Sequence, residues 1–403
     1  MRVGRPGRPC TLDRVDPDIR LGLDNGPVGA PTETTKGASP SASTTTTTST
    51  TTTATAGTAH PVSLLFAGDV LIHGPVADAA RRPDGSYDFA PLFAPVAGIV
   101  SAADVAVCHM EIPIDDDDDD ISSYPLFYAP RRLADGLAET GFDGCSTASN
   151  HSLDQGGEGV DTTLAVLDAA GLKHAGTGRS QAEAVRPAVY EVDGIRIAHL
   201  SYSYDTNGQP FPPGAPWAVN LIDPAQVIAD ARAAREAGAE VVVASLHWGL
   251  EYNQKATGEQ EVIAQAVMAS DAVDLVVGHH AHVPQGIRKV AGRWVVFGLG
   301  NFVSNQSAAC CHPAAQDGVV VRVDLAFPPG APKAGRAAVR RVVFTPVRMD
   351  RSGYRVVPVA EALRTPSLAG GLGPDELRTS FLRTVAVVAA TPDPLLQPSA
   401  NLP

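Results

Sequence analysis

Short apolar runs alternate with amphipathic stretches from residue 61 onward, and this pattern predicts the secondary structure of the folded part. Eight of these runs have the length and the pattern of buried or half-buried strands. They lie at residues 62–67, 104–110, 142–149, 195–202, 241–248, 274–278, 294–300 and 318–325. Helical periodicity falls between them, most clearly at Gly159–Ala170, Pro224–Ala237 and Glu259–Ser270.

The alternation of strands and helices predicts the fold class. It indicates an α/β domain in which much of the pairing is parallel and helices cover the sheet faces. Residues 337–359 resemble an antiparallel hairpin that finishes the sheet, followed by a helix near Pro374–Val387. We therefore expect a disordered Thr/Ser-rich segment at 1–60, a folded domain at 61–348, and a C-terminal helix and loose tail at 349–403.

Composition narrows the classes of function. The 403 residues are 44% hydrophobic and 19% charged, which is typical of a globular protein. The formal net charge of −13, without clustered Lys and Arg, argues against a nucleic-acid-binding surface. No apolar run reaches the roughly 18 residues of a transmembrane helix, so no membrane span is encoded.

The N-terminal region carries two conflicting signals about location. Residues 1–60 lack the apolar core of a secretory signal, which favours the cytoplasm. Residues 32–59 form a Thr/Ser tract whose composition is typical of a flexible or glycosylated stalk outside the cell. Both locations therefore stay open.

The five cysteines show neither a disulfide framework nor a zinc pattern, because their count is odd and no CxxC occurs. Cys310 and Cys311 are adjacent, and neighbouring residues rarely bridge without strain. We expect two thiols in a surface loop. The alternative is that one of them pairs elsewhere.

Polar side chains follow six of the predicted strands at the point where each strand ends. In an open α/β sheet, ligands bind beyond the carboxyl ends of the strands. Singly, each such residue has a structural explanation, such as a turn or an N-cap. Together they predict one site. The residues are Asp69 and His73, Glu111, Asn150 and His151, His247, then His279, His280 and His282, and Asn301.

This mixture of donors indicates a metal ion. Carboxylate, amide and imidazole ligands suit one or two ions of Zn, Mn or Fe rather than Ca²⁺, which prefers oxygen alone. Such an ion lowers the pKa of bound water to about 7, so the predicted chemistry is hydrolysis. His151 directly follows Asn150 and is placed to protonate a leaving group, and Asp154 would orient its ring.

Six motifs carry a family resemblance. They are "GDVLIH", "MEIPI", "SNHSLDQGGEGVDTTLAVLDAAGLKHAGTG", "LHWGLEY", "GHHAHVPQGI" and "GLGNFVSNQ". In order and spacing they resemble the CapA (PgsA) family of poly-γ-glutamate capsule synthesis proteins. That family is similar to calcineurin-like metallophosphoesterases, which implies a four-layer sandwich of two β-sheets between two helix layers. It also implies His151 as the acid and, as metal ligands, Asp69, Glu111, Asn150, His247, His280 and His282.

The sequence departs from these patterns at several positions. Asp69 is four residues from His73, where phosphoesterases have Asp-x-His, so His73 would support a ligand or contact substrate. We expect the same of Glu251 and Asn301. The Asn that usually stands two residues before the Glu is replaced by His109, which is either an extra ligand or a strand residue facing the other side. We expect the latter.

Residues 115–120 are six consecutive aspartates. Like charges repel and stay solvated, so we expect an exposed, mobile loop. The alternative is a loose external cation site.

These features leave three functional hypotheses. The first is a metal-dependent hydrolase of a phosphoester or of an anionic polymer, with other capsule synthesis proteins as further candidate partners. The second is a non-catalytic component of capsule assembly or export at the cell surface, which the family and the Thr/Ser stalk favour. The third is an intracellular phosphatase, which fits the missing signal peptide.

Overall fold

The computed structural model describes residues 62–327 and 337–402, and the chain divides into two compact units, residues 1–58 and 59–403. The Thr/Ser-rich segment expected at 1–60 and Cys10 lie outside the described residues. All described elements belong to the second unit. Within the described part of the chain, no helix combines the length and the apolar character that crossing a lipid bilayer requires.

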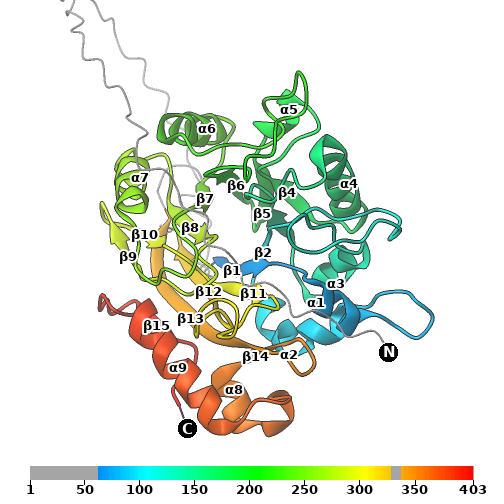
Figure 1. Cartoon of the computed structure of the whole chain (residues 1–403). Coiled ribbons are helices and arrows are strands. Elements are labelled where there is room, and N and C mark those ends of the chain that lie inside the picture. The colour runs from blue at the N-terminus through cyan, green and yellow to red at the C-terminus, as the bar shows by residue number, and fades with distance from the viewer. Residues whose placement is uncertain (1–61, 328–336, 403) are drawn as a thin grey trace, which may run out of the picture. The chain divides into compact units, whose positions relative to one another are not determined.

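Two β-sheets form the centre of the second unit (Figure 1). Nine described strands make the first sheet, in the order β14 (Arg355–Pro358), β13 (Ala338–Asp350), β12 (Asp317–Ala326), β1 (Val62–Val70), β2 (Val105–Met110), β3 (Gly144–Ser146) and β4 (Lys173–Ala175), with β11 (Asn301–Val303) on β1 and β15 (Leu396–Pro398) on β13. Six make the second, in the order β5 (Ala188–Val192), β6 (Ile195–Ser203), β7 (Val241–His247), β8 (Leu275–His279), β10 (Arg293–Val296) and β9 (Ile287–Val290).

Pairing within the sheets follows the predicted pattern. The runs β1–β2–β3–β4 and β6–β7–β8–β10 are parallel, which confirms the prediction of extensive parallel pairing. The β13–β14 pair is the predicted antiparallel hairpin. The carboxyl ends of the parallel strands therefore lie along one edge of each sheet.

Helices in chain order are α1 (Gly74–Ala80), α2 (Ala90–Val100), α3 (Arg132–Thr140), α4 (Gly156–Ala169), α5 (Gln181–Ala184), α6 (Pro224–Glu236), α7 (Gly258–Ala269), α8 (Val359–Arg364) and α9 (Pro374–Val388), with a 3₁₀ turn at Pro366–Leu368. The predicted helices are confirmed as α4, α6, α7 and α9. At α7 a capping box explains the start, because the Thr257 side chain accepts the N–H of Gln260 and the Gln260 side chain accepts the N–H of Thr257.

Side chains alternate along the strands between two environments. In β1, Leu64 and Phe66 belong to a core that also contains Val243 of β7, so this core lies between the sheets. Leu65 of β1 packs into a second core with α2, α3 and α4. Val242 of β7 packs into a third core with α6 and α7. The unit therefore has four layers, two sheets between two helix layers, which confirms the predicted fold class.

The C-terminal residues are attached to the first sheet. β13 continues past residue 348 to Asp350, and β15 pairs with β13. The buried Asp317 carboxylate of β12 accepts hydrogen bonds from Arg348 at 2.6 Å and from Ser380 of α9 at 2.7 Å. The boundary expected after residue 348 thus falls inside a strand, and the described part of the tail is not loose.

Two further expectations need correction. Asp115 is buried and its carboxylate accepts the N–H of Asp120 at 3.0 Å, so the aspartate run is not exposed throughout. Cys310 and Cys311 form a disulfide bond with each other, so they are not two separate thiols. Another disulfide bond joins Cys108 of β2 to Cys145 of β3, which occupy directly paired positions. That pairing depends on strand register, which the cysteine spacing does not reveal.

Candidate metal centre

Strand register brings the predicted ligands together. Asp69, near the end of β1, pairs with His109 of β2 and with Asn301 of β11. His247, at the end of β7, pairs with His279 of β8 in the other sheet. A contact of 2.8 Å between His109 Nε2 and His247 Nδ1 joins the two sheets. Residues that are far apart in the sequence therefore meet beyond the carboxyl ends of parallel strands.

Gly68 allows β1 to approach the residues before β11. A Cβ atom at this position would lie 1.9 Å from the carbonyl oxygen of Gly300. The same oxygen accepts the N–H of Asp69 at 3.0 Å. Because Gly68 has no side chain, β1 can come this close, and the hydrogen bond then holds Asp69 beside Asn301.

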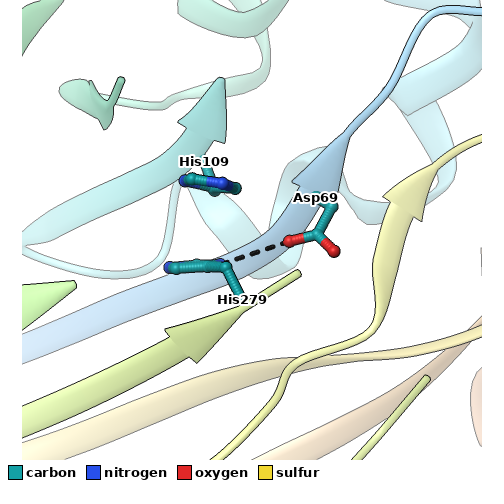
Figure 2. Close-up of side chains that lie close together, drawn as sticks. All are labelled: Asp69, His109 and His279. Carbon is teal, nitrogen blue, oxygen red and sulfur yellow. Dashed lines mark ion pairs between the residues drawn. The ribbon is translucent and has the colours of Figure 1, made fainter. Parts of the chain in front are cut away.

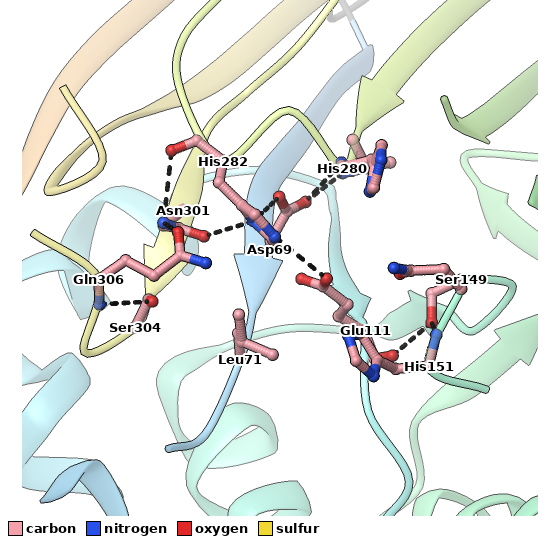
Figure 3. A network of polar contacts seen from close by, with 12 residues as sticks. Asp69, Leu71, Glu111, Ser149, His151, His280, His282, Asn301, Ser304 and Gln306 are labelled. Atoms are coloured by element: carbon pink, nitrogen blue, oxygen red, sulfur yellow. Dashed lines mark hydrogen bonds and ion pairs between the residues drawn. The ribbon is translucent and has the colours of Figure 1, made fainter. Parts of the chain in front are cut away.

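The side chains of Asp69, Glu111 and His282 form a buried cluster (Figure 3). One ligand atom from each lies within 4.8 Å of the others. His282 Nδ1 is 3.1 Å from Asp69 Oδ2 and 3.0 Å from Asn301 Oδ1. His282 Nε2 is 3.5 Å from Glu111 Oε1. The cluster therefore offers two carboxylates and an imidazole to one small volume.

Glu111 gives the clearest test of whether a cation fits. Its side chain is fully buried, and among the described residues neither carboxylate oxygen has a hydrogen-bond partner. Burying a carboxylate that accepts no hydrogen bond is costly, and a coordinated cation would compensate its charge. The residues present therefore fit a divalent metal ion.

The electrostatics of the cluster show the same need for positive charge. Burial raises the pKa of Glu111 well above its usual value. Burial lowers the pKa of His282, but the carboxylates of Glu111 and Asp69 outweigh this effect and raise it to about 10. Burial also acts to raise the pKa of Asp69, yet the rings of His279 and His282 lower it overall. Without metal, a protonated His282 supplies the charge that an ion would bring.

Three other predicted ligands lie beside this cluster. His247 Nε2 is 2.7 Å from Asn150 Oδ1, and the ring centroids of His247 and His280 are 4.7 Å apart. The backbone N–H of His280 approaches Asp69 Oδ1 at 3.4 Å. Burial lowers the pKa of His280 to about 3 and the pKa of His247 well below its usual value, so both rings are neutral, the form that binds metal.

The backbone at His280 and His282 is unusual. Their φ angles are +85° and +55°, in the left-handed region that residues other than glycine rarely adopt. Such conformations persist where the surrounding structure holds them, often at functional sites. The backbone thus holds His280 and His282 in place. With the contacts described above, the structure brings all six residues predicted as ligands together.

His151 and Asp154 form a hydrogen-bonded pair. His151 Nδ1 lies 2.8 Å from Asp154 Oδ2, and the same oxygen accepts the N–H of Phe127 at 2.8 Å. The Asp154 side chain is 1% exposed and that of His151 is 12% exposed. His151 Nε2 lies 3.4 Å from Asn207 Nδ2. The predicted acid is thus oriented by a buried carboxylate and remains within reach of solvent.

The remaining predicted residues lie in different surroundings. Asn301 contacts His282 and donates to the carbonyl oxygen of Ala315 at 2.9 Å. His73 Nδ1 lies 3.2 Å from the carbonyl oxygen of Leu71, and burial lowers the pKa of His73 to about 4. Glu251 is exposed in the segment after β7, and its charge helps to raise the pKa of His282. Only Asn301 of these three directly supports a ligand.

His109 faces the cluster, so the expectation that it faces the other side is wrong. Its ring is buried, with its centroid 4.0 Å from that of His279 (Figure 2). Asp69, His109 and His279 form a second group with ligand atoms within 4.8 Å of one another. The alternation along β2 could have identified this orientation, because Val107 faces the core between the sheets and His109 shares its face.

The segment after β6 supplies two residues that the strand-end pattern missed. The Tyr204 ring lies 4.6 Å from that of His280 and is 42% exposed. Asn207 accepts a hydrogen bond from Asn150 Nδ2 at 3.1 Å. Both follow the strand predicted at 195–202, so the same rule applied to that strand would have found them.

Comparisons with known proteins agree on one family. The family model described as "Bacterial capsule synthesis protein PGA_cap" matches residues 63–306. "Capsule biosynthesis protein CapA" of Bacillus anthracis is 31% identical over 186 residues, which is 44% of this chain and 44% of that protein. "PGA biosynthesis protein CapA" of Bacillus subtilis (strain 168) is 33% identical over 176 residues, 42% of this chain and 44% of that protein. The matches span less than half the length of either relative.

Among solved structures, the calcineurin-like phosphoesterase YfkN from Bacillus subtilis aligns with a TM-score of 0.43 and 12% sequence identity. The alignment covers 81% of this chain and 96% of that chain.

Proposed function

The chain belongs to the bacterial capsule synthesis protein family PGA_cap, and we propose that it is a metal-dependent hydrolase of phosphoester bonds or of an anionic polymer. The observation that carries this proposal is the buried Glu111 carboxylate, which faces His282 and has no hydrogen-bond partner among the described residues. A site that served only the fold would gain stability if this carboxylate accepted hydrogen bonds or were replaced by an apolar side chain.

Two sets of ligands support this proposal. One ion would be held by Asp69, Glu111 and His282, and a second by Asn150, His247 and His280. Their mixed oxygen and nitrogen donors suit Zn, Mn or Fe. When bound, such ions stabilise charge on a phosphoryl or acyl oxygen and provide a water that ionises near neutral pH.

His151 would act as the general acid in this proposal. Asp154 Oδ2 lies 2.8 Å from His151 Nδ1 and orients the ring, which leaves Nε2 as the atom that would donate a proton to a leaving group. The N–H of Phe127 fixes the position of the Asp154 carboxylate in turn. Proton donation therefore requires no residue that serves as a metal ligand.

The names of the relatives and the charge at the site support the proposed substrate classes. Both relatives are named for capsule or PGA biosynthesis, so an anionic polymer is the first candidate and a phosphoester the second. Burial raises the pKa of Tyr204, and the carboxylates of Glu251, Asp205 and Glu111 raise it further. Because this field repels anions, we expect substrate to bind only when metal is present.

Turnover by the metal-loaded protein tests the proposal. The chain is loaded separately with Zn²⁺, Mn²⁺ and Fe²⁺, and its metal content is measured. Each sample is then assayed with bis(p-nitrophenyl) phosphate and with poly-γ-glutamate as substrates. We expect metal-dependent cleavage of at least one of them, and its loss in Asp69→Asn. A protein that holds metal and cleaves neither would count against hydrolysis.

A non-catalytic role in capsule assembly or export at the cell surface is the competing proposal, and the family description favours it. Complementation of a capsule-deficient strain separates the two. A hydrolase requires that His151→Ala fails to restore the capsule, whereas restoration to the wild-type level would favour the assembly role.

A further inference from the structure

The His109 ring occupies a fully enclosed position with both nitrogens engaged. Its Nε2 lies 2.8 Å from His247 Nδ1, and its Nδ1 lies 2.8 Å from Ser146 Oγ. The flat face of the ring stacks on His279, with 4.0 Å between centroids and 15° between planes (Figure 2). A histidine held in this way beside a metal site can bind an ion, direct a neighbouring ligand, or serve packing alone.

The stacking argues against His109 as a ligand. The nitrogen lone pairs of an imidazole lie in the plane of its ring. Because the planes of His109 and His279 are nearly parallel, their lone pairs run side by side instead of converging on one ion. The Nε2 atom of His109 also points at His247, so it cannot direct a lone pair toward an ion as well. The close grouping of Asp69, His109 and His279 therefore needs a different explanation.

Proton positions supply that explanation. His247 Nε2 and Asn150 Oδ1 are 2.7 Å apart. If His247 carries its proton on Nε2, it donates to Asn150 and has no lone pair there for an ion. If the proton is on Nδ1, then Nε2 and the amide oxygen are two acceptors that repel each other at this distance, unless a cation binds both.

The second arrangement is completed by the residues behind His247. The Nδ1–H of His247 is donated to His109 Nε2, and His109 then carries its own proton on Nδ1 and donates it to Ser146 Oγ. The Ser146 hydroxyl in turn faces the carbonyl oxygen of Cys108 at 3.3 Å. Each donor in this series has one acceptor, and the series ends on the backbone.

We propose that His109 is a positioning residue that accepts the Nδ1–H of His247 and thereby directs the Nε2 lone pair of His247 toward a metal ion shared with Asn150. This inference rests on the proposed metal site. It assigns the buried His109 a role in selecting one tautomer of a ligand, which is the role that hydrogen-bond acceptors behind metal-bound histidines commonly have.

Three substitutions distinguish this role from simple packing. In His109→Gln, the side-chain oxygen reaches as far as imidazole Nε2 and can accept from His247. In His109→Asn, the amide reaches only as far as Nδ1, so it keeps the contact with Ser146 and loses the one with His247. In His109→Leu, both polar contacts are lost.

The full chain is titrated with Zn²⁺ by calorimetry, and thermal unfolding of each metal-free variant verifies folding. We expect His109→Gln to bind Zn²⁺ nearly as tightly as the wild type, and His109→Asn and His109→Leu to bind about 10- to 100-fold more weakly. In ¹⁵N-histidine-labelled wild type, the shifts of His247 in the loaded protein should report protonation at Nδ1.

Wild-type affinity in His109→Leu would overturn the inference, as would a folded His109→Gln that binds as weakly as His109→Leu. Protonation of His247 at Nε2 in the loaded wild type would overturn it as well, and needs no variant. A wild type that binds no Zn²⁺, Mn²⁺ or Fe²⁺ would overturn the proposed function together with this inference, so the two failures are distinguishable.

Discussion

Glu111 Oε1 lies 3.5 Å from His282 Nε2, and these two atoms face each other across the buried centre of the site. The separation is longer than a normal hydrogen bond. Two ligands that each lie about 2.1 Å from one ion are separated by roughly 3 to 3.5 Å. The spacing of Glu111 and His282 is therefore that of two ligands around an ion.

Substitution Glu111→Gln should weaken metal binding by more than about 100-fold, because it removes a charged ligand without changing the shape of the side chain. The stability of the metal-free protein should change little, because the amide has the shape of the carboxyl group and burial already disfavours the charged form of Glu111, whose pKa it raises. Calorimetric titration with Zn²⁺ and denaturant unfolding with a chelator measure the two quantities.

The aspartate run provides the control. Asp116 and Asp117 are exposed carboxylates, and Asp116→Asn with Asp117→Asn removes two negative charges near the surface. Tightly bound metal should be retained in this variant. Equal losses of affinity in Glu111→Gln and in the control would show that general charge, not coordination by Glu111, determines binding.

Metal removal should lower the thermal stability of the wild type. An ion that binds only the folded state contributes about 2.7 kcal/mol when its concentration is 100 times Kd. Thermal unfolding with excess Mn²⁺ or Zn²⁺ and with a chelator measures this difference. Asp69→Asn should unfold at the same temperature under both conditions, and a metal-dependent shift that persists in that variant would place the ion elsewhere.

Removal of the proposed acid should separate catalysis from metal binding. We expect His151→Asn to lower turnover by about 10²- to 10⁴-fold while the metal content stays that of the wild type. Asp154→Asn should lower turnover too, because the carboxylate orients the His151 ring. Steady-state kinetics and metal analysis on the same samples test this. Loss of metal in His151→Asn would instead make His151 a ligand.

A substitution at Gly68 should damage the site through the backbone. The Cβ atom of Gly68→Ala would meet the Gly300 carbonyl, so β1 and the residues before β11 must separate, which should cost roughly 3 kcal/mol and weaken metal binding. Gly98→Ala in α2 has open space around its Cβ and should raise stability by up to about 1 kcal/mol. Denaturant unfolding compares them, and equal stability of the two variants would contradict the role of Gly68.

The sequence predicted much of the site because parallel strands share one carboxyl edge. Asp69, His247 and Asn301 each follow an apolar run, and the register of β1, β7 and β11 places them as the strand-end rule requires. The apolar pattern predicts only that both faces of the strands are covered, whereas the four-layer arrangement was implied by the family resemblance.

Other features depend on contacts that no local pattern encodes. A lone histidine in a strand is more often structural than a ligand, which predicts the wrong face for His109, although Val107 of the same strand marks the orientation. Helix α2 was not predicted, and it contains Pro95, which weakens a helical pattern. The bond between Cys108 and Cys145 requires the register of β2 and β3, which becomes known only when the sheet is assembled.

The most direct test of the central claim is anomalous scattering from crystals of the protein purified without chelator. Data collected on both sides of the absorption edges of Zn, Mn and Fe locate and identify any bound ion. We predict an anomalous peak within bonding distance of the side chains of Asp69, Glu111 and His282. A crystal that binds these metals only at other positions, or that shows no peak between these side chains after soaking with each metal, would contradict the account.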